Sequence, residues 1–232
     1  MPAARGFRSA LERVADGGEV AVIAEVKRAS PSKGWLAPDL DPAEFAGRYQ
    51  AGGAACLSVL TDVEFFRGSP KDLAVARGAC TLPVLRKDFT VDDRDVCDAR
   101  LMGADSVLLI AAALDDDELG RFADLARRVG LDALVEVHDE AELARAVAVG
   151  ADLVGVNQRD LVSFRVDTAR AVRMAPQMPP GVVRVAESGI AGPGDAAELA
   201  AAGYHAVLVG EHLVTSDDPE AGVAALRAAR GR

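Results

Sequence analysis

The sequence predicts an α/β domain in which eight parallel strands alternate with helices. One pattern recurs four times: a glycine that ends a helix is followed by a short apolar run. The four glycines lie 50, 47 and 53 residues apart, at Gly53, Gly103, Gly150 and Gly203. Glycine accepts the left-handed conformation that closes a last helical turn, and a wholly apolar run is typical of a strand buried on both faces. Each copy is therefore predicted to be a joint between a helix and a strand.

Four further apolar runs lie between these joints and supply the remaining strands, at residues 19–27, 82–89, 132–138 and 181–188. Amphipathic segments join the strands, and residues 115–129 and 140–149 are the clearest of them. Their acidic residues come early, where the helix dipole favours negative charge. Eight βα units in 232 residues predict one closed (βα)8 TIM barrel, because an open doubly wound sheet usually has fewer strands.

Composition narrows the functional class before any motif is considered. Acidic residues outnumber basic ones by 36 to 26, so we expect neither a nucleic acid nor an acidic membrane surface as a partner. A small anionic substrate stays possible, because a local site can be basic on an acidic protein. The three cysteines fit neither a disulfide framework nor a CxxC metal site. With no signal peptide and no apolar run near roughly 20 residues, a cytoplasmic location is expected.

Polar side chains follow the apolar runs at the point where each predicted strand ends. A single such residue is usually a solvated loop residue, but burying unpaired charge repeatedly would cost several kcal/mol each time without a function. In TIM barrels the chemistry lies at the carboxyl ends of the strands. Assuming that Glu25 and Lys27 face the barrel mouth, we predict a convergent site there from five strand ends, which carry Glu25 and Lys27, Arg86-Lys87-Asp88, Glu136, Asn157, and Glu187-Ser188.

The three histidines, His138, His205 and His212, lack the spacing of metal ligands, so we expect no metal site and assign them surface or packing roles.

Two glycine-containing turns after the last two strands predict a phosphate site. Ser188-Gly189-Ile190 follows the seventh strand, and Gly210-Glu211 follows the eighth. Free backbone amides in such turns can bind a phosphate, and TIM barrels commonly bind it at these two strands. The alternative is that the glycines only turn the chain.

Seven segments, in order, resemble indole-3-glycerol phosphate synthases. The longest is 25–34 (EVKRASPSKG), and the others are 58–62 (SVLTD), Phe65-Phe66 with Gly68-Ser69, 85–89 (LRKDF), 135–140 (VEVHDE), Asn157 with 159–161 (RDL), and 186–190 (AESGI). The resemblance runs from about residue 19 to the C-terminus. It implies ring closure, decarboxylation and dehydration of 1-(2-carboxyphenylamino)-1-deoxyribulose 5-phosphate to indole-3-glycerol phosphate, a step of tryptophan biosynthesis that needs no cofactor.

The resemblance also implies roles for individual residues. Lys87 is the general acid, Glu136 the acid/base carboxylate, and Lys27 the amine that contacts the substrate carboxylate and assists dehydration. Glu25 and Glu187 orient the amines and keep them protonated, while Asn157 and Ser188 bind the reacting oxygens. The substrate-binding positions are Ser30, Pro31, Ser58, Phe66, Phe89, Leu109 and Arg159, with Gly189, Gly210 and Glu211 at the phosphate.

The sequence departs from the family pattern at its N-terminus, at His212 and at Arg94-Asp95, where the family commonly has Tyr-Gln. Residues 1–18 form a shorter segment before the barrel at 19–232 than is usual, and we expect 7–14 to be the remnant of a helix that covers the barrel mouth. His212 stands where the family usually has a small residue beside the phosphate turn.

Three alternative functions stay open. Another phosphate-binding barrel enzyme, such as a phosphoribosylanthranilate isomerase, should show an acid/base pair of Cys and Asp in place of two lysines. A Schiff-base aldolase needs a deprotonated lysine, which nearby acids oppose. A non-catalytic paralogue would bind an anthranilate sugar phosphate without turnover. We expect a small-molecule enzyme that is a monomer or a weak homo-oligomer.

Overall fold

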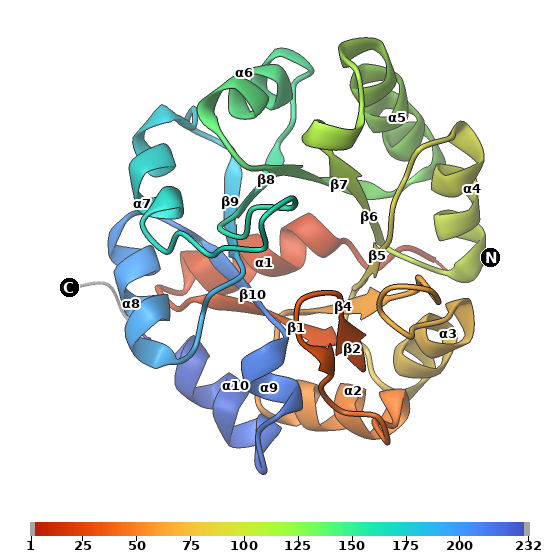
Figure 1. The fold of residues 1–232 in the computed structure, drawn as a ribbon, viewed down its shortest axis with the longest axis vertical. Helices are drawn as coiled ribbons and strands as arrows, with labels where there is room; N and C mark the ends of the chain where they lie inside the picture. The colour runs from red at the N-terminus through yellow and green to blue at the C-terminus, as the bar shows by residue number, and fades with distance from the viewer. Residues whose placement is uncertain (1–2, 230–232) are drawn as a thin grey trace.

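The computed structural model describes residues 3–229, and its strands close into a barrel (Figure 1). Every neighbouring pair in the order β1-β10-β9-β8-β7-β6-β5-β4 is parallel, and β4 closes the barrel against β1. The barrel strands are β1 (Ala21–Val26), β4 (Cys56–Leu60), β5 (Val84–Lys87), β6 (Ser106–Ile110), β7 (Asp132–Val137), β8 (Leu153–Asn157), β9 (Val183–Glu187) and β10 (Ala206–Val209). The predicted (βα)8 TIM barrel is confirmed.

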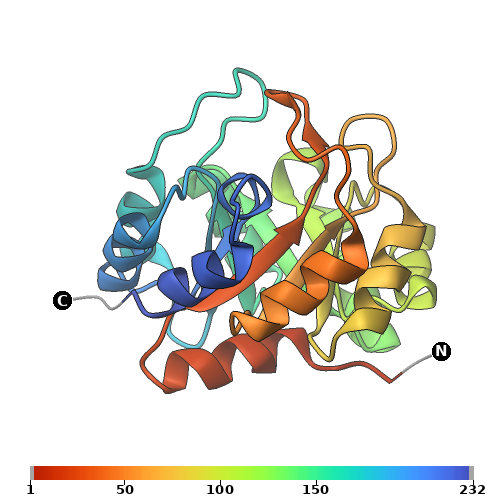
Figure 2. The same cartoon turned by 90° about the horizontal axis from the view of Figure 1, so that it is seen from below.

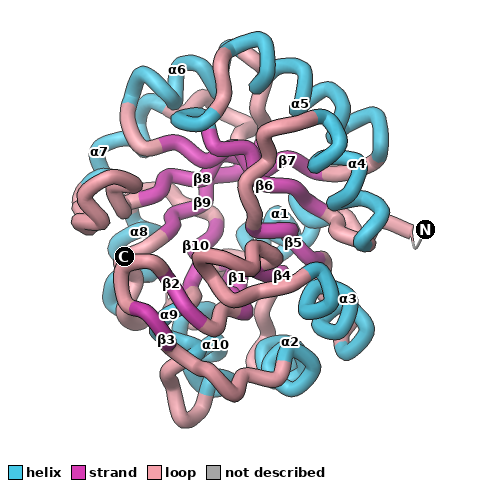
Figure 3. The backbone as a smooth tube through the Cα atoms, turned by 45° about the vertical axis from the view of Figure 1, so that its right-hand side comes forward, coloured by secondary structure: helices cyan, strands magenta, loops and turns pink. Residues whose placement is uncertain are grey.

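Helices form a ring around the strands (Figures 1 and 3). The ring contains α2 (Pro42–Ala51), α3 (Pro70–Ala79), α4 (Asp93–Met102), α5 (Asp116–Val129), α6 (Glu140–Ala148), α7 (Arg170–Met174), α8 (Pro193–Ala201) and α10 (Pro219–Arg227), with the short α9 (Glu211–Val214), η1 (Ala111–Ala113) and η2 (Ala175–Gln177). The four repeated glycines all have φ between 72° and 95°, as a joint between helix and strand requires. Local sequence therefore sets where these helices end.

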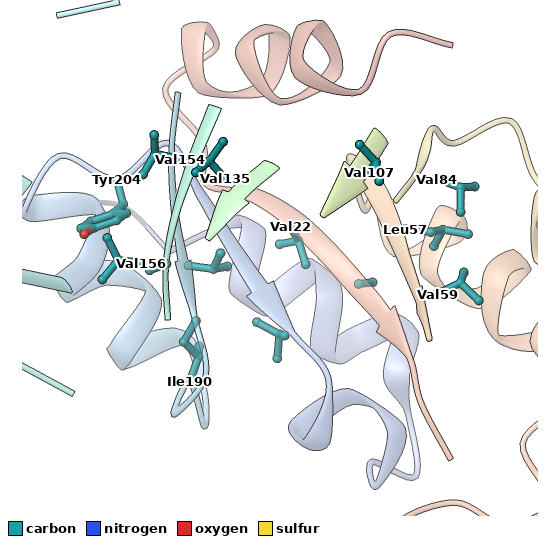
Figure 4. Close-up of a cluster of buried hydrophobic side chains, with 14 of the residues drawn as sticks. Val22, Leu57, Val59, Val84, Val107, Val135, Val154, Val156, Ile190 and Tyr204 are labelled. Carbon is teal, nitrogen blue, oxygen red and sulfur yellow. The ribbon is translucent and has the colours of Figure 1, made fainter. Parts of the chain in front are cut away.

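Alternation along the strands divides the core into two layers. Outward side chains such as Val22, Leu57, Val107 and Val154 pack between strands and helices (Figure 4). Inward side chains, including Ile23 and others from every strand, fill the barrel interior. Because Ile23 points inward, Glu25 two residues later belongs to the same face, which confirms the register assumed from the sequence.

Helix α1 (Phe7–Asp16) lies across the amino-terminal end of the barrel (Figure 2). Phe7 and Leu11 are fully buried against the inward side chains of the strands. The Arg8 amide donates to Asp132 Oδ2 at 2.9 Å, at the start of β7. This corrects the expectation that the segment covers the barrel mouth. Its apolar face closes the opposite end, where strand-start carboxylates accept amides that have no partner inside the helix.

The loops that follow the strands lie at the other end of the barrel (Figure 2). A small hairpin of β2 (Ala29–Ser30) and β3 (Gly34–Trp35) follows β1, and a long loop joins β8 to α7. Within residues 3–229, no helix has the length and apolar character needed to cross a membrane.

Candidate active site

A cavity of about 500 Å³ opens at the carboxyl ends of the strands. It brings together fifteen of the seventeen predicted site residues: Glu25, Lys27, Ser30, Pro31, Phe66, Lys87, Phe89, Glu136, Asn157, Arg159, Glu187, Ser188, Gly189, Gly210 and Glu211. Leu161, Phe164 and Thr215 also line the cavity and were missed by the sequence reasoning, whereas His212, which the sequence placed beside the phosphate turn, lines it too.

Two predicted substrate-binding residues lie elsewhere. Leu109 points out of the barrel and packs in the layer beneath the helices, whereas Leu108 and Ile110 on the same strand face the cavity. Successive side chains on a strand point to opposite faces, so a prediction that is one residue out of register selects the wrong face. The leucine that lines the cavity is Leu108 and not the predicted Leu109. Ser58 is fully buried behind Glu25, and its hydroxyl donates to Glu25 Oε2 at 3.2 Å. Ser58 therefore supports a wall residue.

Lys87 ends β5 with its amine between two buried carboxylates. Nζ donates to Glu136 Oε2 at 3.2 Å and lies 3.7 Å from Glu187 Oε2. Burial alone would lower the pKa of this amine, but the charges of Glu136 and Glu187 outweigh burial and raise that pKa well above its ordinary value. The amine is protonated at neutral pH and can donate into the cavity.

The two carboxylates beside Lys87 ionise differently. For Glu136, the cost of burial is outweighed by the charge of Lys87 and by several hydrogen-bond donors, which hold its pKa far below the ordinary value. Burial and the charge of Glu136 raise the pKa of Glu187 to about 8. Glu136 is therefore the more readily ionised of the two carboxyl groups, and Glu187 holds its proton to a higher pH. The sequence reasoning had made Glu187 the group that holds an amine protonated, and Glu136 is the nearer counter-ion.

A glycine makes room for this arrangement. Gly155 lies on β8, and a Cβ at its position would collide with Glu187 Oε1. Nothing in the sequence reasoning singled out Gly155, because its requirement comes from a side chain on another strand.

Glu25 and Lys27 form a second ion pair on the opposite side of the cavity. Lys27 Nζ donates to Glu25 Oε1 at 2.5 Å, and the Tyr49 hydroxyl donates to the Glu25 backbone carbonyl at 3.1 Å. Burial raises the pKa of Glu25, but Lys27 and Lys87 lower it more, so the carboxylate is ionised. A Cβ at Gly210 would approach Lys27 Nζ to 2.8 Å. The glycine turn after β10 therefore lies directly beside the Lys27 amine.

Asn157 links the charged centre to the loop after β8. Its Nδ2 donates to Glu136 Oε1 at 3.1 Å, and its Oδ1 accepts the Arg159 amide at 3.0 Å. The Arg159 guanidinium donates to the Phe164 carbonyl at 3.1 Å, across the loop. Arg159 thus fixes loop geometry, with Leu161 and Phe164 at the cavity wall.

His138 was assigned a surface or packing role from the sequence, and the structure corrects that assignment. Its Nε2 lies 3.3 Å from Glu136 Oε1, and its side chain is only 11% exposed. The sequence could have indicated this contact, because His138 is two residues after Glu136 and residues two apart at a strand end share a face.

The two turns after β9 and β10 line the cavity. Ser188 and Gly189 have φ of 66° and 74°, and the side chain of Gln158 donates to the Ser188 carbonyl at 2.8 Å. Gln158 is 1% exposed and was missed by the sequence reasoning. Glu211 and His212 are the first two residues of α9, and the backbone amides of a first helical turn have no acceptor within the helix. Such amides suit an anion.

Comparison with known proteins decides the family. Residues 1–226 match the family described as indole-3-glycerol phosphate synthase. The chain belongs to the indole-3-glycerol phosphate synthase family. An indole-3-glycerol phosphate synthase from a Nocardioides species is 57% identical over 202 residues, which cover 87% of this chain and 78% of that relative. This confirms the resemblance found in the seven motifs.

Structural similarity extends further than sequence similarity. A thiamine phosphate pyrophosphorylase from Pyrococcus furiosus aligns with a TM-score of 0.65 at 18% identity, covering 90% of this chain and 93% of that one. At this identity the likeness shows the fold alone. Membership of the indole-3-glycerol phosphate synthase family makes the chain a carboxy-lyase of tryptophan biosynthesis.

Proposed function

We propose that the cavity binds 1-(2-carboxyphenylamino)-1-deoxyribulose 5-phosphate and converts it to indole-3-glycerol phosphate, carbon dioxide and water. The observation that carries the proposal is the Lys87 amine at the cavity wall, 3.2 Å from the buried carboxylate of Glu136 and 3.7 Å from that of Glu187. A second amine, Lys27, stands on the other side of the same cavity. The reaction needs proton donors and a base around one carbon skeleton, and these residues supply both without a cofactor.

In the first step, Lys87 acts as the general acid. The ring carbon that bears the carboxylate attacks the ribulose carbonyl carbon, and the carbonyl oxygen takes a proton from Nζ. A buried, oriented donor stabilises the charge that develops on this oxygen. Carbon dioxide then leaves, and the electron pair of its broken bond returns to the ring.

In the second step, the new hydroxyl leaves as water and the neighbouring carbon loses a proton. Glu136 is ionised and serves as the base, while Lys27 donates to the departing oxygen and contacts the substrate carboxylate before it is lost. Asn157 and Ser188 hydrogen-bond the reacting oxygens. Asn157 already binds Glu136, so it also orients the base.

The substrate's two ends require different surroundings. Its phosphate would lie against the amides of Gly189, Gly210 and Glu211, with Lys27 beside the second turn. Its anthranilate ring would lie against Phe66, Phe89, Leu108, Ile110 and the Ser30-Pro31 turn. Phe65 packs edge-on against Phe89, with ring centroids 6.3 Å apart, and so supports that wall.

The ionisation of Lys87 opposes the aldolase alternative. Imine formation needs a neutral amine, and the two carboxylates raise the pKa of Lys87. We also propose a cytoplasmic enzyme that works on a small molecule as a monomer or weak homo-oligomer. Free, buried Cys56 and Cys80 support a reducing compartment.

The test is a substitution that removes the Lys87 amine while keeping the length of the side chain. We expect Lys87→Met to lower kcat at least about a hundredfold, the usual contribution of a general acid. Lys71→Met is the matched control, because Lys71 is exposed on α3. Fluorescence of the indole product gives the rate, and circular dichroism checks folding. Undiminished turnover in folded Lys87→Met would remove Lys87 from the mechanism.

A further inference from the structure

The imidazole of His138 lies between two carboxylates, one inside the catalytic cluster and one outside it. Nε2 is 3.3 Å from Glu136 Oε1, and Nδ1 is 3.0 Å from Glu142 Oε2. The His138 backbone amide donates to the same Glu142 oxygen at 2.7 Å. Both ring nitrogens therefore face a carboxylate oxygen, and the ring is fixed from β7 on one side and α6 on the other.

The charged surroundings of His138 favour its protonated form. Burial alone would lower the pKa of the imidazole, but its interactions with Glu136 and Glu142 outweigh burial and raise that pKa to about 9. Beyond Glu136 lie Lys87 on β5 and Glu187 on β9. β8 contributes the neutral Asn157, whose side chain donates to Glu136 and whose backbone carbonyl accepts from the Arg170 guanidinium of α7. The segment η1 between β6 and α5 consists of three alanines, and its Ala111 carbonyl accepts from the Arg145 guanidinium of α6.

We propose that His138, held as an imidazolium by Glu142, is a positioning residue that determines which of the two carboxylates beside Lys87 is ionised. Its positive charge lies against Glu136 and has no direct contact with Glu187 among the interactions of the described residues. Glu136 is thereby kept as the anion, and the one proton of the pair stays on Glu187. The proposal rests on the proposed function, in which ionised Glu136 is the base.

Loss of the imidazolium has a defined electrostatic consequence. Without that charge, both carboxylates hold protons more tightly, and Glu136 loses more of its advantage because it is the direct partner. In a fraction of the molecules the proton then lies on Glu136 in place of Glu187. A protonated Glu136 cannot act as the base. Two coupled carboxylates titrate as a pair, so both pKa values seen in the rate profile should rise.

The experiment compares His138→Gln with wild type across pH. Glutamine keeps one N–H donor toward Glu136 but carries no charge. We expect kcat at pH 7 to fall about tenfold with little change in KM. Both pKa values in the plot of log kcat against pH should shift to higher pH by about one unit. His205→Gln is the matched control, because His205 lies at the far end of the barrel, where its Nδ1 accepts the Arg184 amide. That control should keep the wild-type profile.

A second variant tests the outer half of the arrangement without touching the cavity. Glu142→Gln should lower the pKa of His138, read from imidazole 15N shifts that the His138→Gln spectrum assigns by difference. The proposal would be overturned if the His138 imidazole of the wild type were already neutral at pH 7. It would also be overturned if His138→Gln had the same pKa values in its pH–rate profile as wild type. Absence of synthase activity in wild type would instead overturn the proposed function, so the two failures are distinguishable.

Discussion

Gly155 lies on β8 opposite the carboxylate of Glu187, where an added Cβ would collide with Oε1 of that carboxylate. The strand has no need of glycine for its backbone, because Gly155 does not have a positive φ. Its small size is required by the neighbouring side chain on β9 alone. A residue without a side chain thus contributes to the geometry around Lys87.

We expect Gly155→Ala to displace Glu187 and to lower kcat, because Lys87 then loses one of its two carboxylate neighbours. Overpacking of this kind also costs about 1–3 kcal/mol of folding free energy. Gly47→Ala on α2 is the control, since nothing lies within 4 Å of a Cβ there. Steady-state kinetics and urea unfolding measure the two effects. Equal kinetics for both variants would show that the Glu187 position is unimportant.

Charged residues at strand ends were predictable, and the ionisation of each was not. Lys87 and Glu136 stand out in the sequence because each follows or interrupts an apolar run. The difference between Glu136 and Glu187 depends on Lys87 from β5 and Asn157 from β8, which both donate to Glu136. It also depends on His138, whose other partner, Glu142, belongs to α6. Such cross-element distances are absent from local sequence patterns.

Strand β6 was predicted correctly as a strand, but its inward and outward side chains were assigned to the wrong faces. The apolar run Ser106–Ile110 was correctly identified as a strand, but every side chain in it is buried, so polarity gave no sign of which face is inward. Leu108 and Ile110 face the cavity, and Leu109 packs toward the helices. Pairing with β5 and β7 sets that register.

The register predicts opposite effects for adjacent leucines. Leu108→Ala should raise KM, because it removes cavity wall from the proposed anthranilate subsite. Leu109→Ala should leave KM unchanged and lower the free energy of unfolding by about 2–5 kcal/mol, the usual cost of such a truncation in a core. Kinetics and chemical denaturation of the two variants separate these outcomes. A raised KM in Leu109→Ala alone would return Leu109 to the site.

The two ends of the barrel have different tasks. The carboxyl ends of the strands carry the cavity, and α1 closes the amino-terminal end (Figure 2). In TIM barrels the first end serves chemistry and the second serves stability. Substitutions at the two ends should therefore have separable effects.

Leu11 on α1 provides the test of this separation. We expect Leu11→Ala to lower the free energy of unfolding by about 2–5 kcal/mol, because Leu11 is fully buried beneath the barrel. Its KM and kcat should match wild type at temperatures where the protein stays folded. Leu101→Ala is the control: with Leu101 65% exposed on α4, its effect should stay within about 0.5 kcal/mol. A large kinetic effect of Leu11→Ala would mean that α1 influences the cavity.

The sequence alone determined the eight strands, the joints between helices and strands, the family and most of the cavity residues. These features depend on short-range chemistry: the hydrophobic period, the conformation of helix-ending glycines, and the motifs within each segment. Tertiary structure decided the end of the barrel that α1 closes, the face of Leu109, the need for Gly155 and the contact of His138 with Glu136. Each of these depends on how distant segments meet in space, and burial then converts that proximity into packing constraints and shifted ionisation.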